Sequence, residues 1–356
     1  MYYNPKRFSI HFRAYAFIKL RMGYHINLKR AALLAIMAAL IILLIRGCYY
    51  ASRTERGASV PEPEPSHPAL FISVYNDKED KVIKTDLEDY LIGVVAAEMP
   101  VSFEPEALKA QAVAARTFTV RRVASLGGSP CGRQGADICT DSACCQAWRS
   151  REALASNWGA MNEEYLDKVS AAVNNTRGKI ITYGGEPIEA LYHSTSGGMT
   201  EDSAHVFAQS LPYLVAVESP GEESGSRFES TVTISRGDFV KKINRSWSKA
   251  GLKSSSLEKQ VKIVSRYDSG RVEAIRLGGA MATGKELRKA LGLDSANFSL
   301  KFTENSVLIT TRGFGHGVGM SQLGANAMAK SGSDYLKILT HYYTGTEVVS
   351  ITYPAG

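Results

Sequence analysis

The stretch that decides the fold is TDLEDYLIGVVAAEMPVSFEPEALKAQAVAARTF, residues 85–118. Thr85 followed three residues later by Glu88 is a capping-box pattern that predicts the start of a helix. Apolar residues then recur at helical spacing as far as Val95. A further step of three residues reaches Glu98, so a carboxylate stands where the apolar face of the helix would continue.

Two prolines separate this helix from a second one. Pro100 ends the first helix, because the residue before a proline is pushed out of the helical region. Pro105 suits the first position of the second helix, which we expect to run from Glu106 to about Arg121. Glu98 therefore lies at a helix end, partly shielded from water, where the pKa of a carboxyl group rises and the group holds a proton near neutral pH. The alternative is a glutamate whose side chain simply extends into solvent.

The positive charge of the chain is concentrated at its beginning. The formal net charge is +7, but residues 1–30 hold seven lysines and arginines and no acid. The rest of the chain has 35 bases and 35 acids, so we expect no nucleic-acid partner. An unbroken apolar run of 15 residues, 31–45, follows the basic segment.

This apolar run is short for a transmembrane helix and long for the core of a signal peptide. We predict a single-pass membrane anchor over residues 31–50, with the basic residues 1–30 in the cytoplasm and the rest of the chain outside. A cleaved signal peptide is the alternative. Residues 51–68 contain several prolines and glutamates and predict a spacer that lifts the next domain off the membrane.

Beyond the spacer we predict a mixed α/β (α+β) fold. A mixed-sheet core, residues 69–221 and 301–356, is interrupted by a smaller α+β lobe at 222–300. The elements expected are strands at 70–75 and 82–84, a helix at 163–174, a hairpin of strands 179–183 and 188–192 around Gly184-Gly185, helices capped by Ser235 and Thr283, and strands at 297–303 and 306–311.

A glycine-rich loop at residues 312–322 is the last notable pattern. Its four glycines occupy alternate positions, which permits positive φ angles and close approach of another backbone. A helix is expected to start at Met320, and its free N–H groups suit an oxyanion, a carboxylate or an acetamido oxygen. The embedded His316 and the pair Ser321-Gln322 indicate a binding site.

Four short motifs occur in order along the chain: AAEMP at 96–100, QAVAART at 111–117, HSTSGG at 193–198 and GHGVGMSQ at 315–322. Together they resemble the stage II sporulation protein D family, over roughly residues 68–353. The resemblance implies a membrane-anchored lytic transglycosylase that cuts MurNAc–GlcNAc strands of peptidoglycan during septal wall remodelling and engulfment. It implies a place on the mother-cell membrane, facing the space between the membranes. It also implies sporulation stage II proteins M and P as partners, the latter trimming stem peptides first.

The residues agree with this activity. Hydrolytic glycosidases generally use two carboxylates, about 5–5.5 Å or 6.5–9.5 Å apart, whereas Glu98 is the single acid here in such a setting. One acid suffices for a lytic transglycosylase, because the 6-hydroxyl of the muramic acid attacks with an effective molarity on the order of 10⁵ M or more. We expect Glu98 to protonate the glycosidic oxygen and then to accept the proton of that hydroxyl. No cofactor is expected for the catalysis.

The other predicted site residues bind the substrate. Arg116 is expected to orient Glu98 or to bind a sugar carboxylate, with a plain surface arginine as the alternative. The polar residues expected to line the groove and form hydrogen bonds with sugar are His193, Ser194, Thr195, Ser196, His316, Ser321 and Gln322. A competing hypothesis is a non-enzymatic peptidoglycan-binding scaffold at the septum. A serine peptidase is a third hypothesis, weakened by the absence of a Gly-x-Ser-x-Gly motif.

Four of the five cysteines lie within 15 residues: Cys131, Cys139, Cys144 and Cys145. The segment around them has few apolar residues and needs a covalent or metal link. An exported domain permits disulfides, in one of three pairings, but adjacent cysteines pair poorly with each other. The alternative that we prefer is a structural Zn²⁺ held by four thiolates. Some members of the family resembled have a zinc site of cysteine and histidine near this place. Cys139 and Cys145 match that pattern best, and free thiols are the third alternative.

Overall fold

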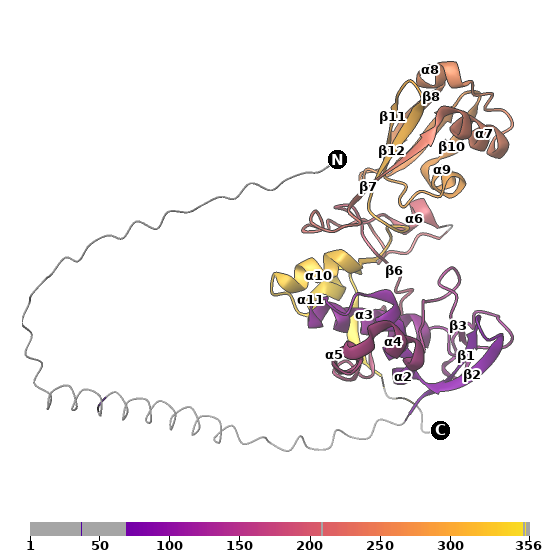
Figure 1. The fold of residues 1–356 in the computed structure, drawn as a ribbon. Helices are drawn as coiled ribbons and strands as arrows, with labels where there is room; N and C mark the ends of the chain where they lie inside the picture. Colours follow the sequence, from indigo (N-terminus) through magenta and orange to yellow (C-terminus); the bar gives the residue numbers. More distant parts are fainter. Residues whose placement is uncertain (1–36, 38–68, 208, 352, 354–356) are drawn as a thin grey trace, which may run out of the picture. The chain divides into compact units, whose positions relative to one another are not determined.

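The computed structural model describes residues 37, 69–207, 209–351 and 353 (Figure 1). The chain divides into two units, residues 1–66 and 67–356. The strands that the structure describes, and every helix discussed below, belong to the second unit. That unit has a mixed α and β composition, as predicted, and its strands form several small sheets.

The predicted membrane anchor has to be corrected. In the part of the chain that the structure describes, no helix is both long and apolar enough to cross a membrane. The stretch 31–50 lies outside the described residues, except for Met37. The predicted basic segment 1–30 and spacer 51–68 lie outside them as well.

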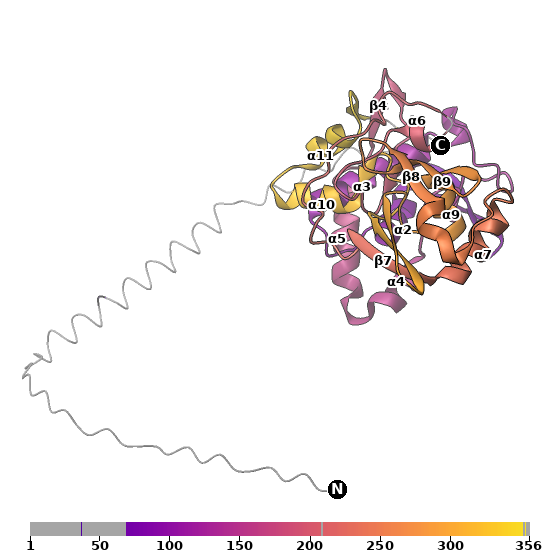
Figure 2. The same ribbon diagram turned by 90° about the horizontal axis from the view of Figure 1, so that it is seen from above.

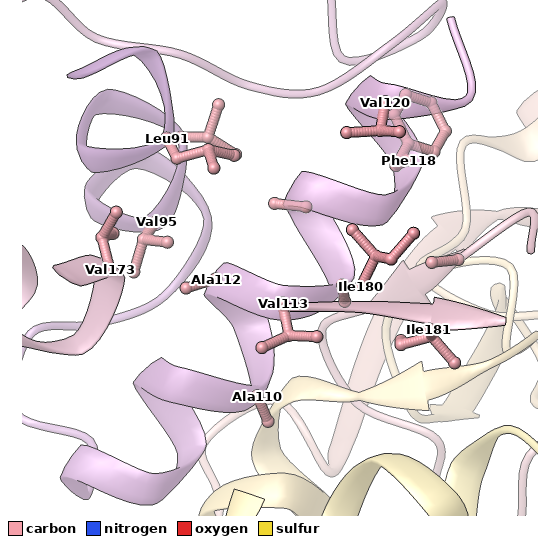
Figure 3. Close-up of a cluster of buried hydrophobic side chains, with 14 of the residues drawn as sticks. Leu91, Val95, Ala110, Ala112, Val113, Phe118, Val120, Val173, Ile180 and Ile181 are labelled. Atoms are coloured by element: carbon pink, nitrogen blue, oxygen red, sulfur yellow. The ribbon is translucent and has the colours of Figure 1, made fainter. Parts of the chain in front are cut away.

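Two helices form the centre of the core: α2 (Leu87–Glu98) and α3 (Pro105–Val120). Nearly every residue of α3 is buried, and many of these residues are alanines. Alanine has the best helix propensity and lets neighbouring helices approach closely. As a result α3 contacts α2, α5 (Asn162–Asn174), α10 (Gln322–Lys330) and α11 (Tyr335–Tyr342). Figure 1 and Figure 2 both show α10 and α11 beside α3. Figure 3 shows apolar side chains of α2, α3, α5 and β4 in one cluster.

The N-cap of the first helix lies one residue later than predicted. Asp86 is the N-cap, and its carboxylate accepts hydrogen bonds from the N–H groups of Glu88 and Asp89 at 2.9 and 3.3 Å. Thr85 belongs instead to the preceding strand. The capping box does not form, because the Glu88 side chain turns inward to a different partner. The helix ends at Glu98, as predicted.

Two small sheets flank these helices. In one, β1 (Phe71–Asn76) lies between β2 (Lys81–Asp86), antiparallel, and β3 (Ile138–Cys139), parallel. In the other, β4 (Lys179–Tyr183) lies between β14 (Glu347–Ser350) and β5 (Glu186–Pro187). The remaining helical elements of the core are η1 (Ala124–Leu126), α4 (Arg151–Trp158), η2 (Gly159–Met161) and α6 (Ser203–Val206).

The predicted strand at 188–192 is wrong in its extent. The strand that forms the hairpin with β4 is β5, which is only two residues long. The chain then leaves that sheet, and β6 (Tyr192–His193) pairs in parallel with β13 (Met320–Ser321). This pairing brings the loop after His193 beside the glycine-rich loop, although about 120 residues separate them in the sequence.

The lobe has a hydrophobic cluster of its own. Its strands form two sheets, ordered β11-β12-β7 and β10-β9-β8. Its elements are β7 (Glu229–Ser235), α7 (Arg236–Ser246), η3 (Ser254–Ser256), α8 (Leu257–Gln260), β8 (Val261–Arg266), β9 (Val272–Leu277), β10 (Ala280–Thr283), α9 (Gly284–Leu291), β11 (Phe298–Phe302) and β12 (Ser306–Arg312). The predicted caps Ser235 and Thr283 are confirmed. Phe298, Val307 and Ile309 belong to the lobe's cluster, so we place the lobe at 229–312 instead of 222–300.

Candidate active site

A cleft of about 910 Å³ is lined by the end of α2 and by several loops. Of the predicted site residues, the structure brings six together on its walls: Glu98, His193, Ser194, Thr195, His316 and Gln322. Arg116, Ser196 and Ser321 do not line the cleft. The loops that carry these residues come from distant parts of the chain, so the cleft exists only in the folded protein.

Glu98 is half-buried on the cleft wall, at the last residue of α2. Its Oε1 accepts a hydrogen bond from the N–H of Ala147 at 2.8 Å, and its Oε2 accepts one from Nε2 of Gln322 at 3.3 Å. Burial raises the pKa of Glu98, and the two hydrogen bonds offset part of that increase. The carboxyl group therefore keeps its proton to a higher pH than a glutamate in water, as a general acid requires.

The segment that holds Glu98 packs directly on the middle of α2. A Cβ on Gly93 would lie 2.4 Å from Nε1 of Trp148 and 2.5 Å from the carbonyl oxygen of Arg149. Glycine in a helix costs about 0.5–1 kcal/mol relative to alanine, and here it permits this close approach. Gln146 fixes the same segment from the other side: it donates to Thr119 Oγ1 at 3.0 Å and accepts from Tyr192 at 2.8 Å.

The loop after His193 and the glycine-rich loop converge on a buried carboxylate that was not predicted from the sequence. Glu222 is fully buried. It accepts hydrogen bonds from the hydroxyls of Ser196 and Ser219, from the N–H of Gly197, and from Ser321 Oγ at 2.5 Å. The prediction that Ser196 and Ser321 bind sugar is therefore wrong, because both side chains are buried against Glu222. No local pattern in the sequence marks Glu222.

The predicted anion site at the start of α10, the helix that follows the glycine-rich loop, is also wrong. Ser321 caps α10 by accepting a hydrogen bond from the N–H of Gly324 at 3.2 Å. The N–H of Leu323 donates to the carbonyl of Ser194 at 3.0 Å. These first-turn donors are thus already used by the protein. The alternate glycines of the loop do adopt positive φ angles, as predicted.

The two histidines of the cleft are neutral near neutral pH. Nδ1 of His193 lies 3.2 Å from the carbonyl oxygen of Val318, so it carries the hydrogen, and Nδ1 of His316 accepts from the N–H of Val318 at 3.1 Å. Burial lowers the pKa of His193 well below its usual range and lowers the pKa of His316 to about 4. They can offer hydrogen bonds, and neither carries a charge near neutral pH.

An arginine of the lobe braces both loops. Arg271 is buried and donates to the carbonyl oxygens of Ser196 and Met199 at 2.9 and 3.0 Å. Burial lowers its pKa to about 10. A Cβ on Gly317 would lie 2.2 Å from Nη2 of Arg271, so glycine is needed for this contact. The lobe, for which the sequence suggested no site residue, therefore supports the cleft through contacts between Arg271 and residues more than 70 positions away.

Arg116 is a structural residue in this fold, and its predicted role beside Glu98 is wrong. Its guanidinium is fully buried and binds the Glu88 carboxylate through Nε at 3.0 Å and Nη2 at 2.6 Å. It also donates to the carbonyls of Val173 and Lys179 at 3.1 and 3.2 Å. The ion pair joins α2, α3, α5 and β4, away from the cleft.

The four clustered cysteines come together beside the cleft, and two of them, Cys144 and Cys145, line it. The sulfur atoms of Cys131, Cys139, Cys144 and Cys145 lie within 4.8 Å of one another, and no disulfide joins them. A tetrahedral zinc ion with Zn–S bonds of about 2.3 Å needs sulfurs about 3.8 Å apart. Burial raises the pKa of Cys139 to about 12 and that of Cys145 further. Their donor set and spacing fit a closed, structural Zn²⁺ site.

Comparison with known proteins agrees with the motifs that converge here. The family model described as "SpoIID: Stage II sporulation protein" matches residues 75–183. Stage II sporulation protein D of Bacillus subtilis (strain 168) is 39% identical over 293 residues, which cover 82% of this chain and 82% of that protein. The chain belongs to the stage II sporulation protein D family.

Two further relatives extend this result. Stage II sporulation protein D of Bacillus amyloliquefaciens is 39% identical over 298 residues, covering 83% of this chain and 84% of that protein. The protein named amidase enhancer of Bacillus subtilis (strain 168) is 30% identical over 310 residues, covering 73% of this chain and 40% of that protein. Membership of the stage II sporulation protein D family confirms the resemblance and makes this chain a sporulation protein.

Proposed function

We propose that this chain is a lytic transglycosylase that cleaves the MurNAc–GlcNAc strands of peptidoglycan. The observation that supports it is the isolation of Glu98. Two carboxylates line the cleft, Glu98 and Glu189. Glu189 is held by Arg121 and Arg122 at 3.1 and 2.6 Å, whereas Glu98 forms no ion pair with any residue that the structure describes and has a raised pKa. A single proton donor suits a reaction whose nucleophile belongs to the substrate.

In this reaction Glu98 starts protonated on Oε2, because Oε1 already accepts the shorter hydrogen bond, from Ala147. It donates that proton to the glycosidic oxygen as the bond from C1 of MurNAc breaks. The carboxylate then takes the proton of the 6-hydroxyl of the same sugar, whose oxygen bonds to C1 and closes the 1,6-anhydro ring. Glu98 ends protonated, as it began.

Gln322 keeps Glu98 in place between the two proton transfers. Its amide nitrogen donates both to Glu98 and to Oε1 of Gln111, each at 3.3 Å. Both distances are slightly longer than the usual range of about 2.7–3.2 Å for an N–H···O hydrogen bond. Gln111 is fully buried on α3, so the amide is anchored to a helix whose residues are nearly all buried in the core.

The test compares two isosteric substitutions in one cleft. Glu98→Gln removes the proton donor and should abolish release of 1,6-anhydro products from glycan strands, measured by mass spectrometry. Glu189→Gln changes the other cleft carboxylate and should leave product formation largely intact. Both variants should still sediment with insoluble peptidoglycan. Continued cleavage by Glu98→Gln, or equal losses in the two variants, would rule out this assignment of Glu98.

A second candidate function is a non-enzymatic peptidoglycan-binding protein that stimulates another wall enzyme. The relative named amidase enhancer favours it. In the same assay this function predicts binding to glycan strands with no anhydro product from the unsubstituted protein. It also predicts that Glu98→Gln has no effect on the stimulation of an added amidase.

The setting of the reaction extends the proposal. We place the unit outside the cytoplasm, at the septal wall during engulfment, with sporulation stage II proteins M and P as partners. Co-purification of each partner with the full chain tests this part of the proposal. A failure to co-purify would rule out these partners, whereas the proposed cleavage of glycan strands would still rest on the product assay.

The four clustered cysteines fit the same proposal as a structural support of the cleft. A zinc ion bound by Cys131, Cys139, Cys144 and Cys145 would be structural, because four protein ligands leave no open position. It would fix the segment that follows Cys145, whose Ala147 N–H holds Glu98.

A further inference from the structure

The charge of the folded unit is balanced overall, but positive and negative residues are unevenly divided between the lobe and the core. The lobe, residues 229–312, holds sixteen lysines and arginines against eight acids. The other described residues of the unit, in 69–228 and 313–353, hold sixteen against 24. The lobe thus has a formal charge of +8 and the core one of −8, although the sequence as a whole shows neither.

The cations of the lobe are mostly unpaired. The structure describes every residue of the lobe, and only two of its sixteen lysines and arginines form ion pairs, Arg236 with Glu258 and Arg312 with Glu229. In the core, eight of the 24 acids take part in ion pairs. The free charge that faces solvent on the lobe is therefore positive.

Five exposed cations gather at one edge of the lobe, which we call the basic edge: Lys249, Lys253, Lys259, Lys262 and Arg276. Lys262 of β8 and Arg276 of β9 are directly opposite each other in the strand register. Nη2 of Arg276 donates to the carbonyl oxygen of Lys259 at 3.3 Å.

Contacts at Gln260 and at Gly279 bring the other two lysines, Lys253 and Lys249, to the same place. The N–H of Lys253 donates to Oε1 of Gln260 at 2.8 Å, and the N–H of Gly278, two residues beyond Arg276, donates to the Gln260 carbonyl at 2.8 Å. The position of a Cβ on Gly279 lies 2.6 Å from the carbonyl oxygen of Lys249. The basic edge is therefore one continuous surface built from a loop, a short helix and two strands.

Like charges directly opposite on neighbouring strands destabilise a sheet. The pair of Lys262 and Arg276 has no acid in ion-pair contact within the described lobe. An anion that lies along this edge would remove the repulsion. The repulsion between these two side chains thus lowers the stability of the free protein, and a negatively charged partner would offset that loss.

We propose that the basic edge binds a linear polymer with a phosphate in each repeat. Lysine ammonium groups bind phosphates as point charges, and four of the five cations are lysines. A polymer is favoured because the cations are spread over several segments. A lipid surface is disfavoured because Met281, opposite Arg276, and Val264, two residues beyond Lys262, are the only large apolar residues exposed on β8, β9 and β10, whereas interfacial binding needs a wide apolar face. The inference does not depend on the proposed glycan cleavage, because its test measures binding.

The test uses the full chain and fluorescently labelled inorganic polyphosphate, followed by anisotropy. Five phosphate contacts predict a slope of log K against log salt of about −3.5, hence about a hundredfold weaker binding at 200 mM than at 50 mM salt. Lys262→Gln with Arg276→Gln should reduce the slope by about 1.4. The matched control, Lys241→Gln with Lys242→Gln on α7, removes the same charge elsewhere on the lobe and should change the slope far less.

Other outcomes would overturn the proposal. Equal effects of the two double variants would show that net charge alone attracts the polymer. Tighter binding to anionic lipid vesicles than to polyphosphate would indicate a membrane surface. Tighter binding to single-stranded DNA than to polyphosphate would indicate a nucleic acid, against the expectation from the sequence. Salt-sensitive self-association lost in the edge variant would indicate a second copy of the chain. Lys253→Gln with Lys259→Gln tests the same edge without altering the strands, and it should weaken polyphosphate binding as well.

Discussion

Replacing Arg116 by methionine tests whether this arginine supports the fold or the substrate. Its guanidinium has no exposed surface, and the Glu88 side chain that it binds is 4% exposed. Two hydrogen bonds join the pair, and the hydroxyl of Tyr353 also donates to Glu88 at 2.8 Å. Methionine fills a similar volume but leaves the Glu88 carboxylate buried without a cation.

The expected cost follows from this burial. Removing one partner of a buried ion pair costs about 3–5 kcal/mol, because the remaining charge is left uncompensated. For a folded unit of this size that loss lowers the melting temperature by roughly 2 °C per kcal/mol, hence by about 6–10 °C. Removing both charges, with Glu88→Leu and Arg116→Met together, should restore most of the stability. The double-mutant cycle should therefore show a coupling energy of several kcal/mol.

The assay is thermal and chemical unfolding of the four proteins in the cycle, with glycan binding measured well below each transition. We expect the Arg116→Met protein to be less stable and to bind glycan strands as the unsubstituted protein does. The reasoning would be refuted by a variant that melts at the original temperature but binds glycan tenfold more weakly. That result would return Arg116 to the substrate-binding role that the sequence suggests.

Three further predictions concern the cleft and its supports. The pKa of Glu98 is higher in the folded state than in the unfolded chain. The contribution of this group to the free energy of unfolding is therefore fully present below the unfolded-state pKa and is lost as the pH rises through the folded-state pKa. Glu98→Gln should therefore stabilise the protein at high pH, by about 1.4 kcal/mol per unit of pKa difference, and not at acid pH; equal stabilisation at both pH extremes would contradict this. Elemental analysis should find about one zinc per chain, and a chelator should lower the melting temperature; a metal-free protein with two disulfides would exclude the site. Gly317→Ala, at a φ of 88°, should cost more in denaturant unfolding than Gly332→Ala, at 89° with open space around it, where only the strain of about 1–2 kcal/mol applies.

Much of the local structure is determined by the sequence alone. The helix that ends at Glu98, the helix ended by Asn174, the caps Ser235 and Thr283 and the strand Lys179–Tyr183 all follow from patterns spanning a few residues. Caps, proline stops and apolar periodicity act between neighbours in the chain, so they can be read without knowing the fold. The position of the acid at a shielded helix end is predictable for the same reason.

The partners of the polar side chains were decided only by the tertiary structure. Ser321 and Glu222 are 99 residues apart, Arg116 and Glu88 are 28 apart, and Arg271 reaches Ser196 across 75 residues. A buried charge must find a partner wherever packing places one, and sequence spacing carries no record of that place. Local chemistry therefore marked which residues are polar and clustered, while long-range packing decided which of them face the cleft and which hold it together.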